Sequence, residues 1–353
     1  MDSSEIHKLR EQLSASLWPK FINSVEIDGL RGWSGQTVQF RFPVVAVVGE
    51  NGTGKTTLLK AVACCYEGET KSQTYFPSDF FQDTPWDSVE GVTIRYSLKQ
   101  GESVISYRVS KKTSRWNFAE IRPKRNVFYQ DISRTLPLDA TAGYARIAKM
   151  GKVETDSENI SNENLIYLSH VLGRQYESAR FAKSDVSKHS VGLFRRSFGE
   201  FSQYHQGAGE DATLDLFKVL ETIPTTSLLI IDEVEASLHP KAQRRLIDFL
   251  LKLARKKRMQ IIVSTHSPYI LEQLPQEARV LLVPGNQGTN VIYGASVEFA
   301  MSRMDDLVHP EMAVYVEDRE SEIWLREMLV ANDAKAPLVD RIDICPVKPA
   351  NVV

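Results

Sequence analysis

The most constraining feature of this sequence is a glycine-rich turn between an apolar run and a helical pattern. It fits G-x-x-x-x-G-K-[ST] at every fixed position, and its residues are Gly49, Glu50, Asn51, Gly52, Thr53, Gly54, Lys55, Thr56 and Thr57. Residues 43–48 predict a buried strand before the turn, and residues 58–62 predict a helix after it. Backbone N–H groups in such a loop, with the positive end of the following helix, bind phosphate oxygens. The sequence therefore predicts a P-loop for ATP, in which Lys55 neutralises the β- and γ-phosphates and the Thr56 hydroxyl ligates Mg²⁺.

Composition limits the compartment and the partners. A chain of 353 residues is long enough for about two domains. The net charge of −2 excludes a globally basic nucleic-acid binder, although local basic patches are compatible with it. The first residues show no basic region followed by an apolar core, and no window reaches the roughly 18 apolar residues of a membrane span. We therefore expect a cytoplasmic protein without a membrane partner.

A second apolar run, residues 227–231, ends in two carboxylates. Asp232 follows the run directly, where it can hold the Mg²⁺ shell, and Glu233 beside it can orient and deprotonate the attacking water. Acidic residues often end strands, but after a complete P-loop this arrangement predicts the Walker B element of an ATPase.

A third apolar run, residues 260–264, is followed by Thr265, His266, Ser267 and Pro268. It predicts another core strand that brings His266 to the carboxyl edge of the sheet, where ligands bind in open α/β sheets. We expect His266 to contact the γ-phosphate or the attacking water. The predicted catalytic residues are therefore Lys55, Glu233 and His266.

A glycine turn at residues 206–210 opens a helical pattern upstream of Asp232. Its backbone N–H groups can bind another phosphate. Because the chain already has a P-loop for the phosphates, this second anion cradle predicts a nucleotide held between two subunits, in a homodimer or higher homo-oligomer.

Taken together with residues 235–240 and 264–268, these motifs resemble ABC-type ATPases, in the branch of the OLD (overcoming lysogenisation defect) family and related phage-defence ATPases. That branch shows D-E-x-E-x-x-L-H-P and S-T-H-S-P, and both patterns stand in this sequence. The resemblance implies that the glycine turn is the ABC signature, with Gly207, Gly209 and Glu210 meeting the γ-phosphate of the partner's ATP. Gly207 and Ala208 replace the usual serine and glycine. Gln82 is the candidate for the Q-loop glutamine.

The segment between the nucleotide motifs, residues 67–204, has a different texture and predicts an insertion. Period-two alternation predicts antiparallel strands at 91–98, 103–109 and 126–129, and a helical pattern runs from 162 to 200. The polar residues 149–164 predict a mobile loop. A basic cluster is a candidate to follow a phosphate backbone or to form a solvated sheet face, and its members are Lys111, Lys112, Arg115, Arg122, Lys124 and Arg125.

The carboxyl end predicts a strand at 313–318, a helix and a second strand at 341–347. This order, with Glu317 at the first strand end, resembles the opening of a TOPRIM domain, in which that glutamate holds divalent metal with a later Asp-x-Asp pair. The pair is absent after Glu317, so nuclease activity of this chain is doubtful. Either the natural protein continues past Val353, or the segment is vestigial, or it is an extra α/β layer without metal.

The predicted fold is α/β, with a P-loop ABC-type ATPase core, an antiparallel β and helical insertion, and a partial TOPRIM-like segment. The predicted units are an N-terminal helix with the first half of the core (1–66), the insertion (67–204), the second half of the core (205–300), and a linker with the partial TOPRIM-like segment (301–353).

We expect an ATP-hydrolysing dimer that controls a nuclease or other effector acting on nucleic acid, DNA foremost, in defence against phage. The alternatives are an ATPase subunit of an ABC transporter, a chromosome-maintenance or break-repair ATPase, and an ATP-dependent assembly clamp with slow or no hydrolysis. The long insertion and the altered signature speak against the transporter. The absence of sustained heptads speaks against the chromosome ATPase.

Overall fold

The P-loop strand lies inside a six-stranded sheet with the order β15-β14-β3-β13-β12-β7. The computed structural model describes residues 3–135, 142–285, 288–305, 310, 312–331, 339 and 342–347. The strands are β3 (Val44–Gly49), β7 (Val127–Gln130), β12 (Leu228–Ile231), β13 (Gln260–Thr265), β14 (Arg279–Gly285) and β15 (Gly288–Tyr293). From β14 to β7 the neighbours are parallel, and β15 is antiparallel to β14. The carboxyl ends of the parallel strands therefore meet at one edge, which is the ligand edge of open α/β sheets.

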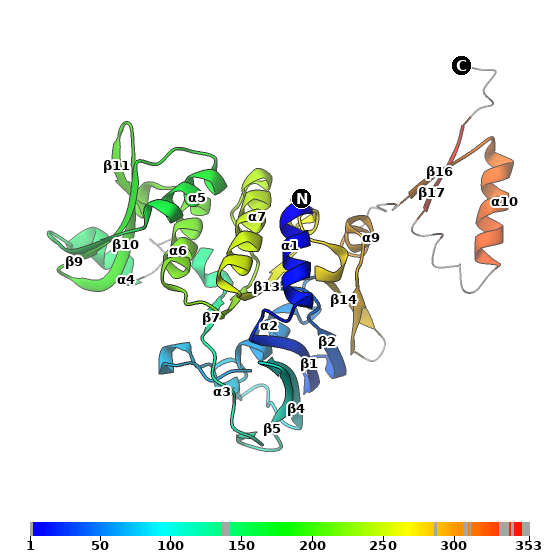
Figure 1. The fold of residues 1–353 in the computed structure, drawn as a ribbon, viewed down its shortest axis with the longest axis horizontal. Coiled ribbons are helices and arrows are strands. Elements are labelled where there is room, and N and C mark those ends of the chain that lie inside the picture. Colours follow the sequence, from blue (N-terminus) through cyan, green and yellow to red (C-terminus); the bar gives the residue numbers. More distant parts are fainter. Residues whose placement is uncertain are drawn as a thin grey trace.

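Helices cover both faces of this sheet. Every residue of β3, β12 and β13 is buried, as expected for parallel strands that have no solvent face. Helix α2 (Lys55–Ala63) packs against β3 and β13, while α7 (Pro240–Lys257) contacts the same strands and also α1 (Ser3–Ser14). Figure 1 shows α7 and α1 above the sheet and α2 below it. The predicted α/β P-loop core is thus confirmed.

A second, antiparallel sheet flanks α2 and has the order β2-β1-β4-β5-β6. Its strands are β1 (Lys20–Leu30), β2 (Trp33–Gln39), β4 (Val92–Gln100), β5 (Ser103–Lys111) and β6 (Trp116–Phe118). The segment predicted as one insertion, 67–204, is therefore divided. Its first strands complete the sheet of the β1-β2 hairpin, and β7 joins the central sheet. Period-two alternation indicates a strand but does not specify its partner, because pairing depends on residues far away in the sequence.

Residues 142–202 form a separate part of the structure, called the lobe here, with a sheet of order β11-β10-β9-β8 (Figure 1). Its elements are α4 (Ala142–Met150), β8 (Glu154–Asn159), α5 (Asn162–Leu172), β9 (Ser178–Ser184), β10 (Ser187–Arg196) and β11 (Gly199–Ser202).

Two expectations about the lobe were wrong. The helical pattern predicted to residue 200 ends at Leu172, because Gly173 adopts a left-handed conformation (φ 69°) that terminates the helix. The polar segment predicted as a mobile loop contains β8, whose side chains are exposed. Its backbone pairs with β9, and two ion pairs, Arg180 with Glu154 and Lys183 with Asp156 (2.8 Å), join the side chains of the two strands.

The carboxyl segment has the predicted order of strand, helix and strand. Parallel strands β16 (Met312–Val316) and β17 (Ile342–Pro346) enclose α10 (Arg319–Val330) in the sequence, and Figure 1 shows this unit standing apart from the sheets. No helix within the described ranges is long and apolar enough to cross a membrane.

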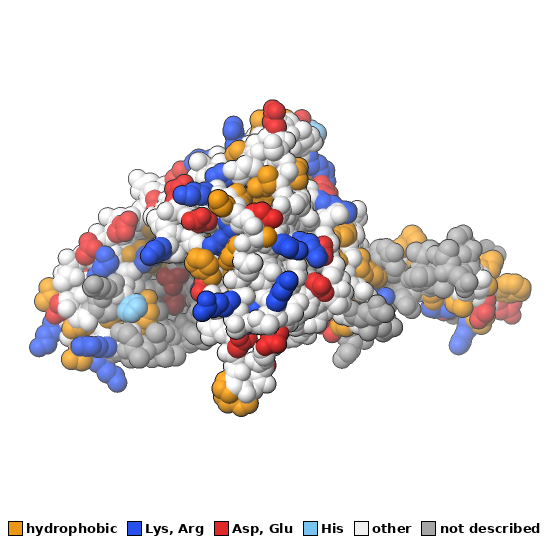
Figure 2. Space-filling view, turned by 90° about the horizontal axis from the view of Figure 1, so that it is seen from below, with side chains coloured by type: hydrophobic (Ala, Val, Ile, Leu, Met, Phe, Trp, Pro, Cys, Tyr) orange, Lys and Arg blue, Asp and Glu red, His pale blue; other side chains and the backbone are white. Residues whose placement is uncertain are grey.

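Half of the basic cluster is buried, and this differs from both interpretations given above. Lys111, Arg122 and Arg125 lie inside the protein, whereas Lys112, Arg115 and Lys124 are exposed. The Arg122 guanidinium donates to the carbonyls of Cys64, Tyr66 and Tyr75 at 2.8–3.3 Å and lies over two aromatic rings. On the face drawn in Figure 2, Lys and Arg side chains are interspersed with Asp and Glu. The buried half of the cluster is therefore a packing feature of this part of the fold.

Replacing Arg122 with Met is expected to lower the free energy of unfolding by about 2–4 kcal/mol, because several buried carbonyls lose their donor together. Urea denaturation followed by circular dichroism measures this change. Lys112→Met, an exposed neighbour, is the matched control and is expected to change the free energy by less than about 0.5 kcal/mol. Equal effects of the two substitutions would contradict the assigned role of Arg122.

Candidate nucleotide-binding site

The P-loop bridges the end of β3 and the start of α2. Gly54 precedes the first residue of α2 and has φ 93°, in the left-handed region that favours glycine. The indole of Trp33, which is buried, packs directly on this glycine: a Cβ at position 54 would lie 2.4 Å from the Trp33 Nε1 atom. The loop therefore requires glycine for its backbone conformation and for the close approach of Trp33.

Lys55 is folded back onto the loop. Its Nζ donates to the carbonyls of Gly49 at 2.8 Å and Glu50 at 2.9 Å, and its side chain is buried. Burial lowers the pKa of Lys55, and the carboxylates at the end of β12 oppose this effect. The ammonium group thus lies within the loop, where it can neutralise the negative charge of a bound triphosphate.

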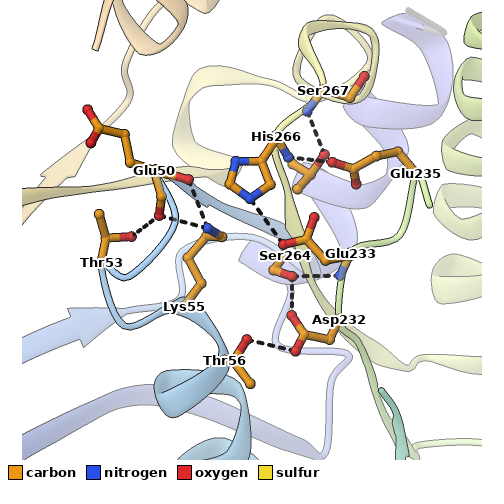
Figure 3. A network of polar contacts seen from close by, with 12 residues as sticks. Glu50, Thr53, Lys55, Thr56, Asp232, Glu233, Glu235, Ser264, His266 and Ser267 are labelled. Atoms are coloured by element: carbon orange, nitrogen blue, oxygen red, sulfur yellow. Dashed lines mark hydrogen bonds and ion pairs between the residues drawn. The ribbon is translucent and has the colours of Figure 1, made fainter. Parts of the chain in front are cut away.

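Asp232 connects the P-loop to two neighbouring strands. The Thr56 hydroxyl at the start of α2 donates to its Oδ2 at 2.8 Å, and the Ser264 hydroxyl on β13 donates to its Oδ1. Asp232 is buried because β12 ends beside β13 at this edge. Figure 3 shows Asp232 between Thr56 and Ser264, with dashed lines to both.

The donor set around Asp232 suits a hard cation. A carboxylate and a threonine hydroxyl, both oxygen donors, lie within hydrogen-bond distance at the edge of the sheet. Mg²⁺ prefers oxygen ligands and is usually bound by one or two protein groups together with substrate phosphates and water. Thr56 and Asp232 therefore fit the predicted Mg²⁺ site.

Glu233 is the second residue of the turn after β12, called the Walker B turn here (residues 232–236), and points toward His266. The His266 Nε2 lies 3.1 Å from the Glu233 Oε1 (Figure 3). Burial favours a higher pKa for Glu233, but the hydrogen bond and charge of His266 and the charges of Lys55 and Arg134 lower it. The carboxylate is thus held ionised next to the P-loop, as a proton acceptor requires.

The second glutamate of the D-E-x-E pattern, Glu235, has a structural contact that sequence reasoning did not assign. Its carboxylate accepts a hydrogen bond from the backbone N–H of His266. Burial raises the pKa of Glu235. This contact fixes the loop after β13 against the Walker B turn, so it orients His266.

The glycine turn at 207–210 opens α6 (Ala208–Thr222) and packs against Ser237, just after the Walker B turn. A Cβ on Gly209 would lie 2.3 Å from the Ser237 carbonyl oxygen, so only glycine allows this approach. Gly207 and Gly209 border a cavity of about 370 Å³, and its other lining residues include Arg174, Ser237 and His239.

Glu210 has a different environment from the one that the resemblance implies. Its carboxylate accepts hydrogen bonds from Arg174 at 3.1 Å and also from Tyr176 and Arg196, all of which belong to the lobe. A carboxylate bound in this way fastens α6 to the lobe. Direct contact with a γ-phosphate would also place two negative charges together.

The Q-loop candidate Gln82 does not lie on a strand of the central sheet. Gln82 is exposed in the connection after α3 (Pro77–Phe80). Gln130 instead ends β7, where its carbonyl accepts from the backbone N–H of Asp232 at 2.8 Å. Gln130 is therefore the better placed glutamine. The signal in the sequence was the apolar run before it, but nothing in that run showed that β7 neighbours β12.

Glu317 follows β16, in the carboxyl unit that stands apart from the sheets in Figure 1. Within the described residues, no group of three or more His, Cys, Asp or Glu side chains is arranged to hold a metal ion. A metal role for Glu317 thus remains a prediction from the TOPRIM resemblance.

Comparisons with known proteins agree with this architecture. The sequence model of the family described as "AAA domain, putative AbiEii toxin, Type IV TA system" matches residues 44–272. No match was found among curated proteins.

Solved structures of SMC head domains are similar to this chain at low sequence identity. One, an Smc head domain with an extended coiled coil bound to the C-terminal domain of ScpA from Pyrococcus furiosus, is 14% identical, with a TM-score of 0.50 over 80% of this chain and 98% of that chain. An SmcHead bound to the C-winged helix domain of ScpA is 16% identical, with a TM-score of 0.50 over 77% and 97%. The SMC head domain from Thermotoga maritima is 15% identical, with a TM-score of 0.47 over 78% and 99%.

Gly54→Ala is expected to weaken binding of a fluorescent ATP analogue at least about tenfold, because the methyl group displaces Trp33 and strains the loop. Fluorescence titration measures the affinity. Gly101→Ala is the matched control, since Gly101 also has a positive φ (61°) but open space around its Cβ position. If both variants bind as the wild type does, the close packing of Trp33 has no part in shaping the loop.

Asp211, in the first turn of α6, gives a prediction about pH. It is buried, and its carboxylate accepts from the Gln203 amide. Burial and the charge of Asp215 raise the pKa of Asp211 to about 7. The folded state therefore keeps a proton that the unfolded state loses between about pH 4 and pH 7, so this group makes stability fall as pH rises through that window.

Asp211→Asn is accordingly expected to stabilise the protein at pH 8 by about 1–3 kcal/mol and to have little effect at pH 4. Urea denaturation at the two pH values measures the difference. Glu102→Gln, at an exposed turn, is the control and is expected to leave the pH dependence unchanged. A destabilising effect of Asp211→Asn at pH 8 would contradict the raised pKa.

Proposed function

The chain belongs to the AAA-domain family whose sequence model it matches over residues 44–272, and on this premise we propose that it binds MgATP at the P-loop edge and hydrolyses it between two copies of the chain. One observation carries the proposal. The end of β12 is tied both to the P-loop, through Thr56 and Asp232, and to the β13 loop, through Glu233 and His266. Residues that bind phosphate and a residue that can accept a proton are thereby held side by side.

Each residue has a defined part in the proposed reaction. Lys55 leaves the loop carbonyls and neutralises the β- and γ-phosphates. Thr56 and Asp232 would hold Mg²⁺, which supplies further neutralisation of the phosphate oxygens. Glu233 accepts a proton from water as the water oxygen bonds to the γ-phosphorus, and the bond to the β–γ bridging oxygen breaks to release ADP. His266 holds Glu233 in place and faces the γ-phosphate that is split from ADP.

The second copy of the chain supplies the other side of the nucleotide. The cavity beside Gly207 and Gly209 is open at the surface of α6, and Arg174 contributes a positive charge to it. Backbone N–H groups and a guanidinium are suitable for a γ-phosphate presented by a partner subunit. The pairing of Glu210 with Arg174 and Arg196 of the lobe reduces its repulsion of that phosphate.

We further propose that the nucleotide state of the dimer controls an effector that acts on nucleic acid, with DNA as the first candidate, in defence against phage. The resemblance to OLD-family ATPases supports this role, and the description of the matched family includes a putative toxin of a toxin–antitoxin system. Two SMC head domains of the same fold were solved with ScpA bound, which supports a protein partner for this fold. The TOPRIM-like segment is the part of this chain that resembles such an effector.

Glu233→Gln is expected to reduce the turnover number for ATP by at least about 100-fold, because the proton acceptor is lost while the phosphate contacts remain. ATP-induced dimers are expected to persist and accumulate. Lys55→Ala is expected to abolish both hydrolysis and ATP-induced dimers. Phosphate release and light scattering after size exclusion measure the two properties, each with and without double-stranded or single-stranded DNA.

Stimulation of wild-type hydrolysis by DNA would support a nucleic-acid-responsive ATPase. Absence of hydrolysis in every condition, together with ATP-induced dimers of the wild type and of Glu233→Gln, would favour the assembly clamp and exclude the enzyme.

A further inference from the structure

Arg134 joins the Walker B turn to the edge strand of the sheet. It lies on the short helix η2 (Ile132–Thr135), which follows β7. Its Nη1 donates to the carbonyls of Asp131 at 2.9 Å and Asp232 at 2.6 Å, and its Nη2 donates to the carbonyl of Glu233 at 2.6 Å. The guanidinium therefore bonds to successive carbonyls on either side of the Glu233 Cα atom.

The peptide groups that Arg134 holds are also held from the opposite side by Ser264. The N–H of Glu233 donates to the Ser264 hydroxyl at 2.7 Å, and the N–H of Val234 donates to the Ser264 carbonyl at 3.1 Å. Each peptide flanking Glu233 is thus fixed at its carbonyl by Arg134 and at its N–H by Ser264. Hydrogen bonds on both flanking peptides thus restrain the backbone of Glu233.

This fixation has a specific purpose, because Glu233 adopts an unfavourable conformation. Its φ of 50° lies in the left-handed region, which costs a residue other than glycine about 1 kcal/mol or more. Without external hydrogen bonds the turn would relax and move the carboxylate away from His266. Arginine suits this task, since its planar fork bonds to two acceptors at once and a lysine ammonium does not have that geometry.

The short helix η2 also contacts α6, the helix that opens with the glycine turn. Movement of α6 would therefore displace η2 and with it Arg134. Neighbouring carboxylates offset the cost of burying the guanidinium: burial lowers the pKa of Arg134, and Asp232, Glu235, Asp131 and Glu233 oppose that effect.

We propose that Arg134 is a positioning residue for hydrolysis, which holds Glu233 in the conformation that presents its carboxylate to the attacking water and links that conformation to α6. This inference rests on the proposed ATP hydrolysis. Arg134 acts through Glu233 and does not itself contact the nucleotide.

The test compares Arg134→Gln and Arg134→Lys with the wild type. Loss of the hydrogen bonds from Arg134 to the carbonyls of Asp232 and Glu233 is expected to lower kcat about 10- to 100-fold. The KM for ATP is expected to stay within about threefold, since small misplacement of a catalytic group affects the chemical step. Arg134→Lys keeps the charge but not the forked geometry of the guanidinium. Its kcat is therefore expected to lie closer to the kcat of Arg134→Gln than to that of the wild type. Arg95→Gln, an exposed arginine paired with Glu26, is the control and is expected to keep the wild-type kcat.

A double variant makes the test sharper. Ser264→Ala removes the hydroxyl on the other side of the same peptide, so the combined loss in Arg134→Gln/Ser264→Ala is expected to be smaller than the product of the single losses. If the loss of kcat in the double variant equals the product of the single losses, the two residues act on different groups. That result would overturn the inference that they hold the same peptides.

The other outcomes are separable. If the wild type hydrolyses ATP and Arg134→Gln has the same kcat, the inference is overturned and the proposed function stands. If Arg134→Gln loses ATP binding or its thermal transition together with activity, Arg134 is a residue of fold stability and the inference is again overturned. Full activity of Arg134→Lys would assign the effect of Arg134 on kcat to its charge, and would overturn the inference that its forked hydrogen bonds position Glu233. A wild type without hydrolysis removes both proposals.

Discussion

The hydrogen bond between Thr56 and Asp232 is the contact on which the rest of the site depends. It joins the first turn of α2 to the end of β12 at 2.8 Å, although the two residues are far apart in the sequence. Asp232 is also bound by Ser264, and Ser264 in turn holds the backbone of Glu233. Through these links the parallel strands β3, β12 and β13 share one polar network at their carboxyl ends. Burial makes this network costly to leave incomplete, because unpaired polar groups lose their hydration.

A second set of contacts joins the lobe to this network. Glu210 binds arginines from the lobe, and the glycine next to it packs on the Ser237 carbonyl after the Walker B turn. On the other side, η2 carries Arg134 from the edge strand to the same turn and contacts α6. The lobe, α6 and the turn are therefore connected through directional polar contacts and close backbone packing.

The sequence was informative where the chemistry is local. The P-loop, the carboxylates after β12 and the histidine after β13 each stand in a short motif, and buried parallel strands read as apolar runs. The α/β core followed from these patterns. The partners of each strand across the sheets did not follow from these patterns. Gln82 was favoured as the Q-loop residue, although Gln130 ends the strand beside β12. The segment 67–204 was treated as one insertion, although its strands join three sheets. Strand alternation carries no information about which strand pairs with which.

By itself, the sequence determined which residues can bind phosphate and accept a proton, because these properties belong to side-chain types and to short spacings along one loop. Only the tertiary structure decided what each polar group faces. Glu210 proved to bind lobe residues, half of the basic cluster proved to be buried, and Arg134 proved to bond to the carbonyls of Asp232 and Glu233. These partners are brought together by strand order and helix packing, which depend on contacts between distant residues. No local pattern in the sequence records those contacts.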